Sequence, residues 1–184
     1  MTMTVVTIAI LLVAGLVFQA LRAWLHMRGT RLVTCPETLA PAAVEVDVRH
    51  FALTSAAGLD ELRLRDCSRW PEKRHCGQMC LSELETAPQG CLVSDRLRRW
   101  YEGKSCSLCG RGIAPIHWHD HKPAFKGADD RIWEWSEIPA EQLPAFLAEA
   151  RAVCWNCMIA EGFRQGHPDL FIERPRPPRP AIRH

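Results

Sequence analysis

The stretch "CWNCMIAEGFRQG", residues 154–166, places two cysteines two positions apart at the start of a predicted helix. A second Cys-x-x-Cys pair, at 106 and 109, is followed by Gly110 and Gly112, which supply the backbone angles that a tight turn around a metal requires. Two such pairs are typical of a metal site, and four thiolates complete a closed, tetrahedral zinc site. We therefore predict structural zinc on Cys106, Cys109, Cys154 and Cys157.

The order of parts between Cys106 and Cys157 is a cysteine turn, a hairpin region and a helix that carries the second pair. This order resembles the treble-clef zinc finger. The sequence Asp120-His121-Lys-Pro123 is also similar to the Asp-His-x-x-Pro of HNH nucleases, several of which carry the same two cysteine pairs. The resemblance implies that Asp120 would be a metal ligand and His121 the general base.

The chain departs from the HNH pattern at two positions. That family needs an asparagine to orient the base, and the only asparagine here, Asn156, lies inside the second cysteine pair. It also needs a histidine directly after that pair, where this chain has Met158, a poor ligand for a hard divalent ion. Met158 equally excludes covalent haem, which requires Cys-x-x-Cys-His. We therefore predict a degenerate HNH-like motif with no catalytic residues.

Three alternating histidines, His117, His119 and His121, would share one face of a strand. We interpret them as a polar strand face beside the zinc rather than as a further metal site.

Five cysteines remain in the first half of the chain. We predict a second closed site on four of them, Cys35, Cys67, Cys76 and Cys80. A quartet with Cys91 in place of Cys35 stays open, and His75 could replace one ligand. The spacing matches neither a common zinc finger nor the usual ferredoxin runs, so zinc, an iron–sulfur cluster and simple buried thiols are all alternatives.

Residues 5–25 are apolar except for Gln19 and Arg22, which is enough to span a hydrocarbon core. No basic residue precedes this run, whereas a cleaved signal peptide has a basic N-terminal region. We therefore expect an uncleaved anchor within residues 1–27.

Basic residues follow the apolar run, at Arg22, Arg28 and Arg31, and no charged side chain precedes it. The positive-inside rule then places the body in the cytoplasm, at the inner membrane of a bacterium. In that reducing compartment cysteines are more often metal ligands than partners in disulfides. The opposite orientation would allow disulfides.

The periodicity predicts an α+β body. Strands are expected at 44–48 and 62–67 with a turn at Gly58 and Asp60, and a further strand at 129–138. Helices are expected at 76–87, with Cys76 and Cys80 on one face, at 91–104, at 139–152 with a break at Pro144, and at 154–166. The predicted organisation is an anchor (1–27), a cysteine-rich subdomain (30–103), a treble-clef-like subdomain (104–170) and a disordered Pro/Arg-rich tail (171–184).

The formal net charge is only +2, and acidic residues slightly outnumber basic ones between residues 32 and 171, so a nucleic-acid surface is not indicated. The chain also shows no phosphate-binding loop and no nucleophile with a base and an orienting group. These features favour a membrane-anchored, zinc-binding interaction protein, a non-catalytic subunit or scaffold with protein partners at the membrane. The alternatives are an iron–sulfur electron-transfer protein and a membrane-tethered HNH-like nuclease.

Overall fold

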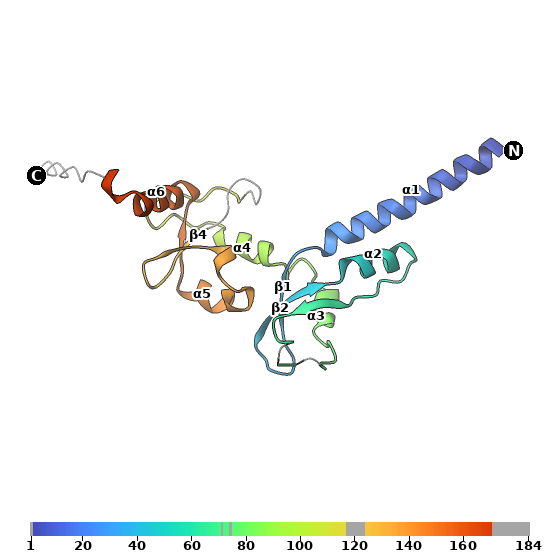
Figure 1. Ribbon diagram of the computed structural model, residues 1–184, viewed down its shortest axis with the longest axis horizontal. Coiled ribbons are helices and arrows are strands. Elements are labelled where there is room, and N and C mark those ends of the chain that lie inside the picture. Colours follow the sequence, from blue (N-terminus) through green and yellow to red (C-terminus); the bar gives the residue numbers. More distant parts are fainter. Residues whose placement is uncertain (1, 71, 74, 117–123, 171–184) are drawn as a thin grey trace, which may run out of the picture.

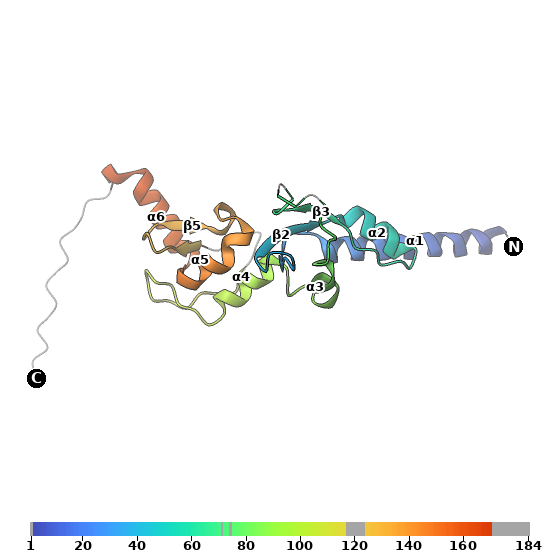
Figure 2. The same cartoon turned by 90° about the horizontal axis from the view of Figure 1, so that it is seen from below.

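The computed structural model describes residues 2–70, 72–73, 75–116 and 124–170. Helix α1 (Thr2–Met27) projects away from the rest of the chain, and the remaining elements form two groups on either side of helix α4 (Val93–Tyr101) (Figure 1). The same arrangement is visible after a quarter turn (Figure 2). The protein therefore mixes helices with two small sheets, and its first element stands outside the body.

The first group contains an antiparallel sheet of strands β1 (Arg31–Thr34), β2 (Pro41–Val46) and β3 (Leu64–Cys67), in that order. Val44 of β2 pairs with Arg31 on one side and with Cys67 on the other. Val44 and Val46 are buried, as their alternation with polar residues predicts. The pairing of the two predicted strands is therefore confirmed, whereas β1 was not anticipated.

The connection between β2 and β3 is a helix, α2 (Val48–Ala56), where we expected only a turn. Asp47 caps it, because its carboxylate accepts a hydrogen bond from the His50 N–H at 3.1 Å. Val48, predicted as a strand residue, consequently begins the helix. Phe51 of α2 and Met27 of α1 belong to one apolar cluster, and α2 runs beside the C-terminal end of α1 (Figure 1).

Helix α3 (Leu81–Thr86) is shorter than predicted, and Cys76 and Cys80 do not share a face of it. Cys80 is the residue before the first turn, and Cys76 lies in the preceding loop. Gln78, between them, has a φ of +51°, a left-handed conformation that an α-helix does not accommodate. Helix α4 agrees with its predicted position and is followed by Gly103 with a φ of +72°.

The second group is built on a sheet of β4 (Ala124–Lys126), β5 (Ile132–Glu134) and β6 (Arg151–Val153), ordered β5-β4-β6 and antiparallel throughout. The other elements are the short 3-10 turns η1 (Trp135–Glu137), η2 (Ala140–Gln142) and η3 (Pro168–Leu170), and the helices α5 (Leu143–Glu149) and α6 (Trp155–Gly166).

Two expectations for the second group were wrong. The helix predicted to continue to residue 152 ends at Glu149, and residues 151–153 pair with β4 instead. Pro144 does not interrupt a helix, because it lies in the first turn of α5, where its missing N–H is not needed. The strand predicted over 129–138 is confirmed only for β5.

Strand β1 lies between two apolar cores. Val33 belongs to a cluster with Val44, Phe51 and Leu84, whereas its neighbour Leu32 belongs to a second cluster. The buried members of that second cluster come from α4, β4, the η1–η2 connection, α5 and β6: Val93, Leu97, Tyr101, Phe125, Ile138, Leu143 and Ala152. Successive side chains of a strand point to opposite faces, so β1 packs against both groups at once.

The side chain of Arg31, at the start of β1, is completely buried. Its guanidinium donates one hydrogen bond to the Pro88 carbonyl and another, of 2.7 Å, to the His26 carbonyl in the last turn of α1. That carbonyl has no partner within the helix, and it lies at the negative end of the helix dipole. Burial lowers the pKa of Arg31, but an arginine stays charged in proteins. Arg31 therefore fastens α1 to the loop that leads into α4.

We predict that Arg31→Ala lowers the free energy of unfolding of the body by about 3 kcal/mol, since two part-buried carbonyls lose their donor and a cavity is left. Arg28→Ala, which removes an exposed arginine three residues earlier, is the control and should change it by less than about 0.5 kcal/mol. Denaturant unfolding followed by tryptophan fluorescence measures both. Equal effects of the two substitutions would contradict the role given to Arg31.

Candidate metal centre

The first cysteine pair lies on a tight turn. The Cys106 N–H donates to the Arg111 carbonyl at 2.8 Å, and the Gly110 N–H donates to the Cys106 carbonyl at 2.9 Å. Gly110 has a φ of +73°, as predicted from the need for an unusual backbone angle, whereas Gly112 does not have a positive φ. The Ser107 N–H reaches the Ala152 carbonyl at 2.9 Å, which holds the turn against β6.

The second pair begins helix α6, as the sequence predicts. Cys154 is the residue before the first turn, and its carbonyl accepts a hydrogen bond from the Met158 N–H at 3.0 Å. Cys157 follows within that first turn. Because β6 ends at Val153, the sheet delivers Cys154 directly beside the turn that carries Cys106, and the Cys154 N–H donates to the Cys106 sulfur at 3.3 Å.

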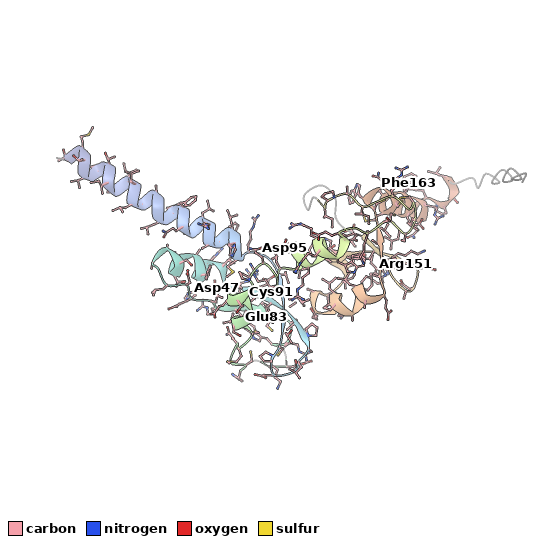
Figure 3. The ribbon with its side chains drawn as sticks, turned by 180° about the vertical axis from the view of Figure 1, so that it is seen from behind. Asp47, Glu83, Cys91, Asp95, Arg151 and Phe163 are labelled. Carbon is pink, nitrogen blue, oxygen red and sulfur yellow. The ribbon has the colours of Figure 1, made fainter. Side chains whose placement is uncertain are left out.

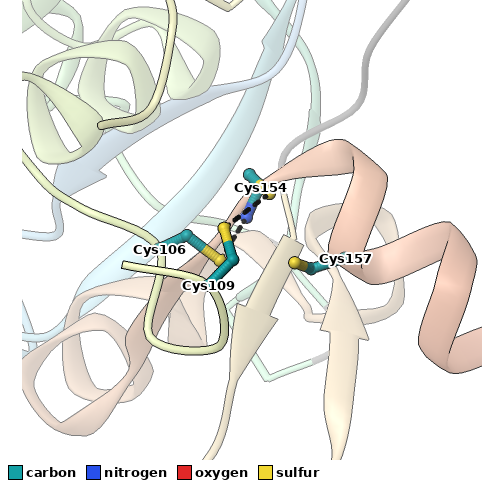
Figure 4. A group of neighbouring side chains, drawn as sticks. All are labelled: Cys106, Cys109, Cys154 and Cys157. Carbon is teal, nitrogen blue, oxygen red and sulfur yellow. Dashed lines mark hydrogen bonds between the residues drawn. The ribbon is translucent and has the colours of Figure 1, made fainter. Parts of the chain in front are cut away.

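The four sulfur atoms of Cys106, Cys109, Cys154 and Cys157 all lie within 4.8 Å of one another (Figure 4). The sulfurs of Cys109 and Cys154 are 3.8 Å apart, and all nine cysteines of the chain are free thiols. A tetrahedral zinc ion with sulfur ligands at about 2.3 Å separates them by about 3.8 Å. The four predicted ligands are thus brought together in a geometry that could hold a metal ion.

The surroundings of the sulfurs favour a cation. Burial by itself raises the pKa of Cys106, but the N–H groups of Cys154, Cys109 and Leu108 donate to its sulfur and lower the pKa to about 6. Burial raises the pKa of Cys154 and, together with the neighbouring sulfurs, that of Cys157. Four adjacent thiolates repel one another, so full ionisation of the set requires a positive ion between them.

Met158, which follows the second cysteine pair, is a core residue. It is buried in a small cluster with Cys106, Ala124 and Val153, and Trp155 packs against that cluster. Its thioether fills the space between α6 and the sheet. Asn156 is exposed, and His167 follows the end of α6 and contacts Phe163 rather than the cysteines.

Several residues named from the sequence lie outside the described residues. These are the HNH-like motif and the three alternating histidines, within residues 117–123, and the tail from residue 171. Trp133 and Trp135 pack against the second apolar cluster, in agreement with a core role.

The predicted first-half quartet is not gathered in the same way. Among the described residues, the set of Cys106, Cys109, Cys154 and Cys157 is the only group of three or more Cys, His, Asp or Glu side chains close enough together to hold a metal ion. Cys91 is buried in the first apolar cluster, with its sulfur 3.9 Å from a carboxylate oxygen of Glu83 (Figure 3). The second metal site therefore stays a prediction.

No protein family, curated protein or solved structure matches this chain.

We predict that Cys109→Ser lowers the zinc content of the purified full-length protein by one ion per chain, because a hydroxyl is a much weaker zinc ligand than a thiolate. Ser107→Ala, in the same turn, should keep the wild-type content, since it is the Ser107 backbone that bonds to β6. Elemental analysis of the two variants and the wild type provides the measurement. Unchanged zinc in Cys109→Ser would rule out the site.

Proposed function

We propose that this chain is a membrane-anchored interaction protein whose cytoplasmic body is stapled by structural zinc, and that it serves as a non-catalytic subunit or scaffold of a membrane complex. The observation that carries the proposal is the closed set of four thiols. Four sulfur ligands leave zinc no open position for a water or a substrate, so such an ion stabilises a fold rather than performing chemistry.

The arrangement around the thiols supports a treble-clef type of zinc site. A cysteine turn comes first, the antiparallel strands β4 and β5 follow, and α6 begins at the second pair. An HNH-like nuclease would need an imidazole at the position of Met158, whose side chain is buried in the core. This favours a site whose metal is structural, in a protein that acts by binding a partner.

Membrane attachment is supported by α1, which is long and apolar enough to cross a bilayer. None of its most apolar 18-residue window is buried in the body, so the helix is not a core element. Its last turns touch the body, where Ala23 and Met27 pack in the first apolar cluster and His26 bonds to Arg31 and Gln89. The Arg28 guanidinium lies over the Trp24 ring at 5.5 Å, an aromatic and basic pair suited to the headgroup region on the cytoplasmic side.

The surface offered to a partner lies on the outer side of α6. Ile159 and Phe163, one helical turn apart, are each about half exposed, at 50% and 51%. Charged residues border them, since Arg131, Glu134 and Glu137 line the adjoining hollow. An apolar centre with a charged rim is the usual composition of a protein–protein interface. The zinc would hold α6 in place, so presentation of this surface would depend on the metal.

We predict that the full-length protein stays in the membrane fraction after alkaline carbonate extraction, and that green fluorescent protein fused to its C-terminus is fluorescent in intact bacteria. Arg22→Glu combined with Arg28→Glu should reduce the fluorescent fraction, because these cations retain the following segment in the cytoplasm. Release by carbonate would contradict the anchor, and a periplasmic C-terminus would contradict the orientation.

We further predict that a photo-crosslinking phenylalanine analogue at Ile159 forms a discrete heavier adduct in native membranes. The same analogue at Arg164, exposed on the same helix, is the matched control and should give little adduct. Combining the Ile159 analogue with Cys109→Ser should abolish the adduct, because α6 loses its attachment. Equal adducts at the two positions, or none at Ile159, would contradict the proposed surface.

A further inference from the structure

The turn after β1 has the same backbone structure as the metal-site turn. The Cys35 N–H donates to the Ala40 carbonyl at 2.9 Å, as the Cys106 N–H does to that of Arg111. The Leu39 N–H donates to the Cys35 carbonyl at 2.8 Å, as the N–H of Gly110 does to that of Cys106. The two turns therefore correspond residue by residue.

The match extends to the strained position of the turn. Leu39 has a φ of +54°, and Gly110, at the equivalent place, has a φ of +73°. A leucine in this left-handed region costs about 1 kcal/mol or more, so the surroundings must hold it there. Leu39 is also 81% exposed, so burial of its side chain does not account for the conformation. The turn therefore adopts a conformation that leucine disfavours. This indicates a role for the residue that the turn positions, Cys35.

The sulfur of Cys35 is surrounded by donors like that of Cys106. The pKa of the Cys35 thiol is lowered, chiefly by the Thr38 side chain and then by the backbone of Thr38 and Glu37. Thr38 stands where the first turn has Cys109, and its buried hydroxyl has no hydrogen-bond partner among the described residues. The turn thus presents one sulfur ligand instead of two.

Three further cysteines lie near this turn. Cys67 ends β3 and is buried in the first apolar cluster, against which Cys35 and Cys80 also pack. The loop that carries Cys76 and Cys80 is held to β3, because the Gln78 side chain accepts a hydrogen bond from the Leu64 N–H at 3.1 Å. Cys35, Cys67 and Cys80 thus contact one apolar cluster, and Cys76 lies in the loop that ends at Cys80.

Cys91 is buried in the same apolar cluster, but its sulfur lies beside Glu83, 4.0 Å from the carbonyl oxygen and 3.9 Å from a carboxylate oxygen. The quartet that replaces Cys35 with Cys91 is consequently disfavoured. Four sulfurs remain, supplied by the turn after β1, the end of β3 and the loop before α3.

We propose that Cys35, Cys67, Cys76 and Cys80 bind a second zinc ion, which crosslinks these three segments of the first half. Binding draws the sulfurs to about 3.8 Å from one another, and each thiol that ligates as a thiolate releases its proton to solvent, with no change of oxidation state. The site goes beyond the proposed function, which rests on the second-half thiols alone. It makes the folding of the first half depend on metal as well.

The test is zinc stoichiometry of the full-length protein in detergent, with the metal alone as the probe. Wild type should hold two zinc ions, and Cys76→Ser should hold one. Cys76 is the suitable position because it is only partly buried and is not a member of the first apolar cluster. Cys91→Ala, which removes a first-half cysteine outside the quartet, is the matched control and should hold two. Combining Cys76→Ser with Cys109→Ser should leave none.

Titration with Co²⁺ gives a second readout that does not depend on yield. Wild type should develop thiolate–cobalt absorbance with two equivalents, and Cys76→Ser with one.

One zinc in wild type that persists in Cys76→Ser and disappears in Cys109→Ser would overturn the second site and leave the proposed function intact. Zinc that depends on Cys76 but not on Cys109 would overturn the proposed function instead. Iron and acid-labile sulfide that are lost in Cys76→Ser would overturn the assignment of zinc.

Discussion

Three consecutive residues of β1 connect the separate parts of this protein. The Arg31 guanidinium binds carbonyl groups at the end of α1 and in the loop before α4, Leu32 packs into the second apolar cluster, and Val33 packs into the first. A strand has only two faces, and here both are buried, so β1 fixes the position of the two cores relative to each other. If α1 spans a membrane, this strand also determines how the body is held against it.

The core of the second half is small near α6. Met158 is the only buried residue of α6, and the cluster around it has four buried members. Burial on that scale stabilises by only a few kcal/mol, comparable with the conformational entropy of ordering a few residues. A metal ion bound by the four thiols would supply the missing stability, which is the usual solution for small units with limited cores. The first half has a larger apolar cluster, but its strands are short, with four, six and four residues in β1, β2 and β3. Its Cys35 turn, which matches the Cys106 turn, points to the same solution.

Local patterns predicted some elements well and others poorly. The alternation around Val44 and the amphipathic character of α4 depend on residues within one element, and both elements were found where expected. Helix α2 was missed because its N-terminus is defined by the Asp47 cap, within a stretch that resembles the end of a strand. The turn at Cys35 was missed for a different reason. Its backbone hydrogen bonds match those of the Cys106 turn, but it has Thr38 and Leu39 where the recognisable pattern has cysteine and glycine.

The amino-acid order alone was sufficient for features that are local and chemical. Helix α1 follows from the length of an uninterrupted apolar run, and the four thiols of the metal centre follow from two Cys-x-x-Cys pairs with a turn and a helix start. The tertiary structure was needed to show that Arg31 is buried rather than a free flanking charge, that Met158 is a core residue, and that the Cys91 sulfur lies beside Glu83. Burial and proximity arise from contacts between segments distant in the chain, and no periodicity within a single segment encodes them.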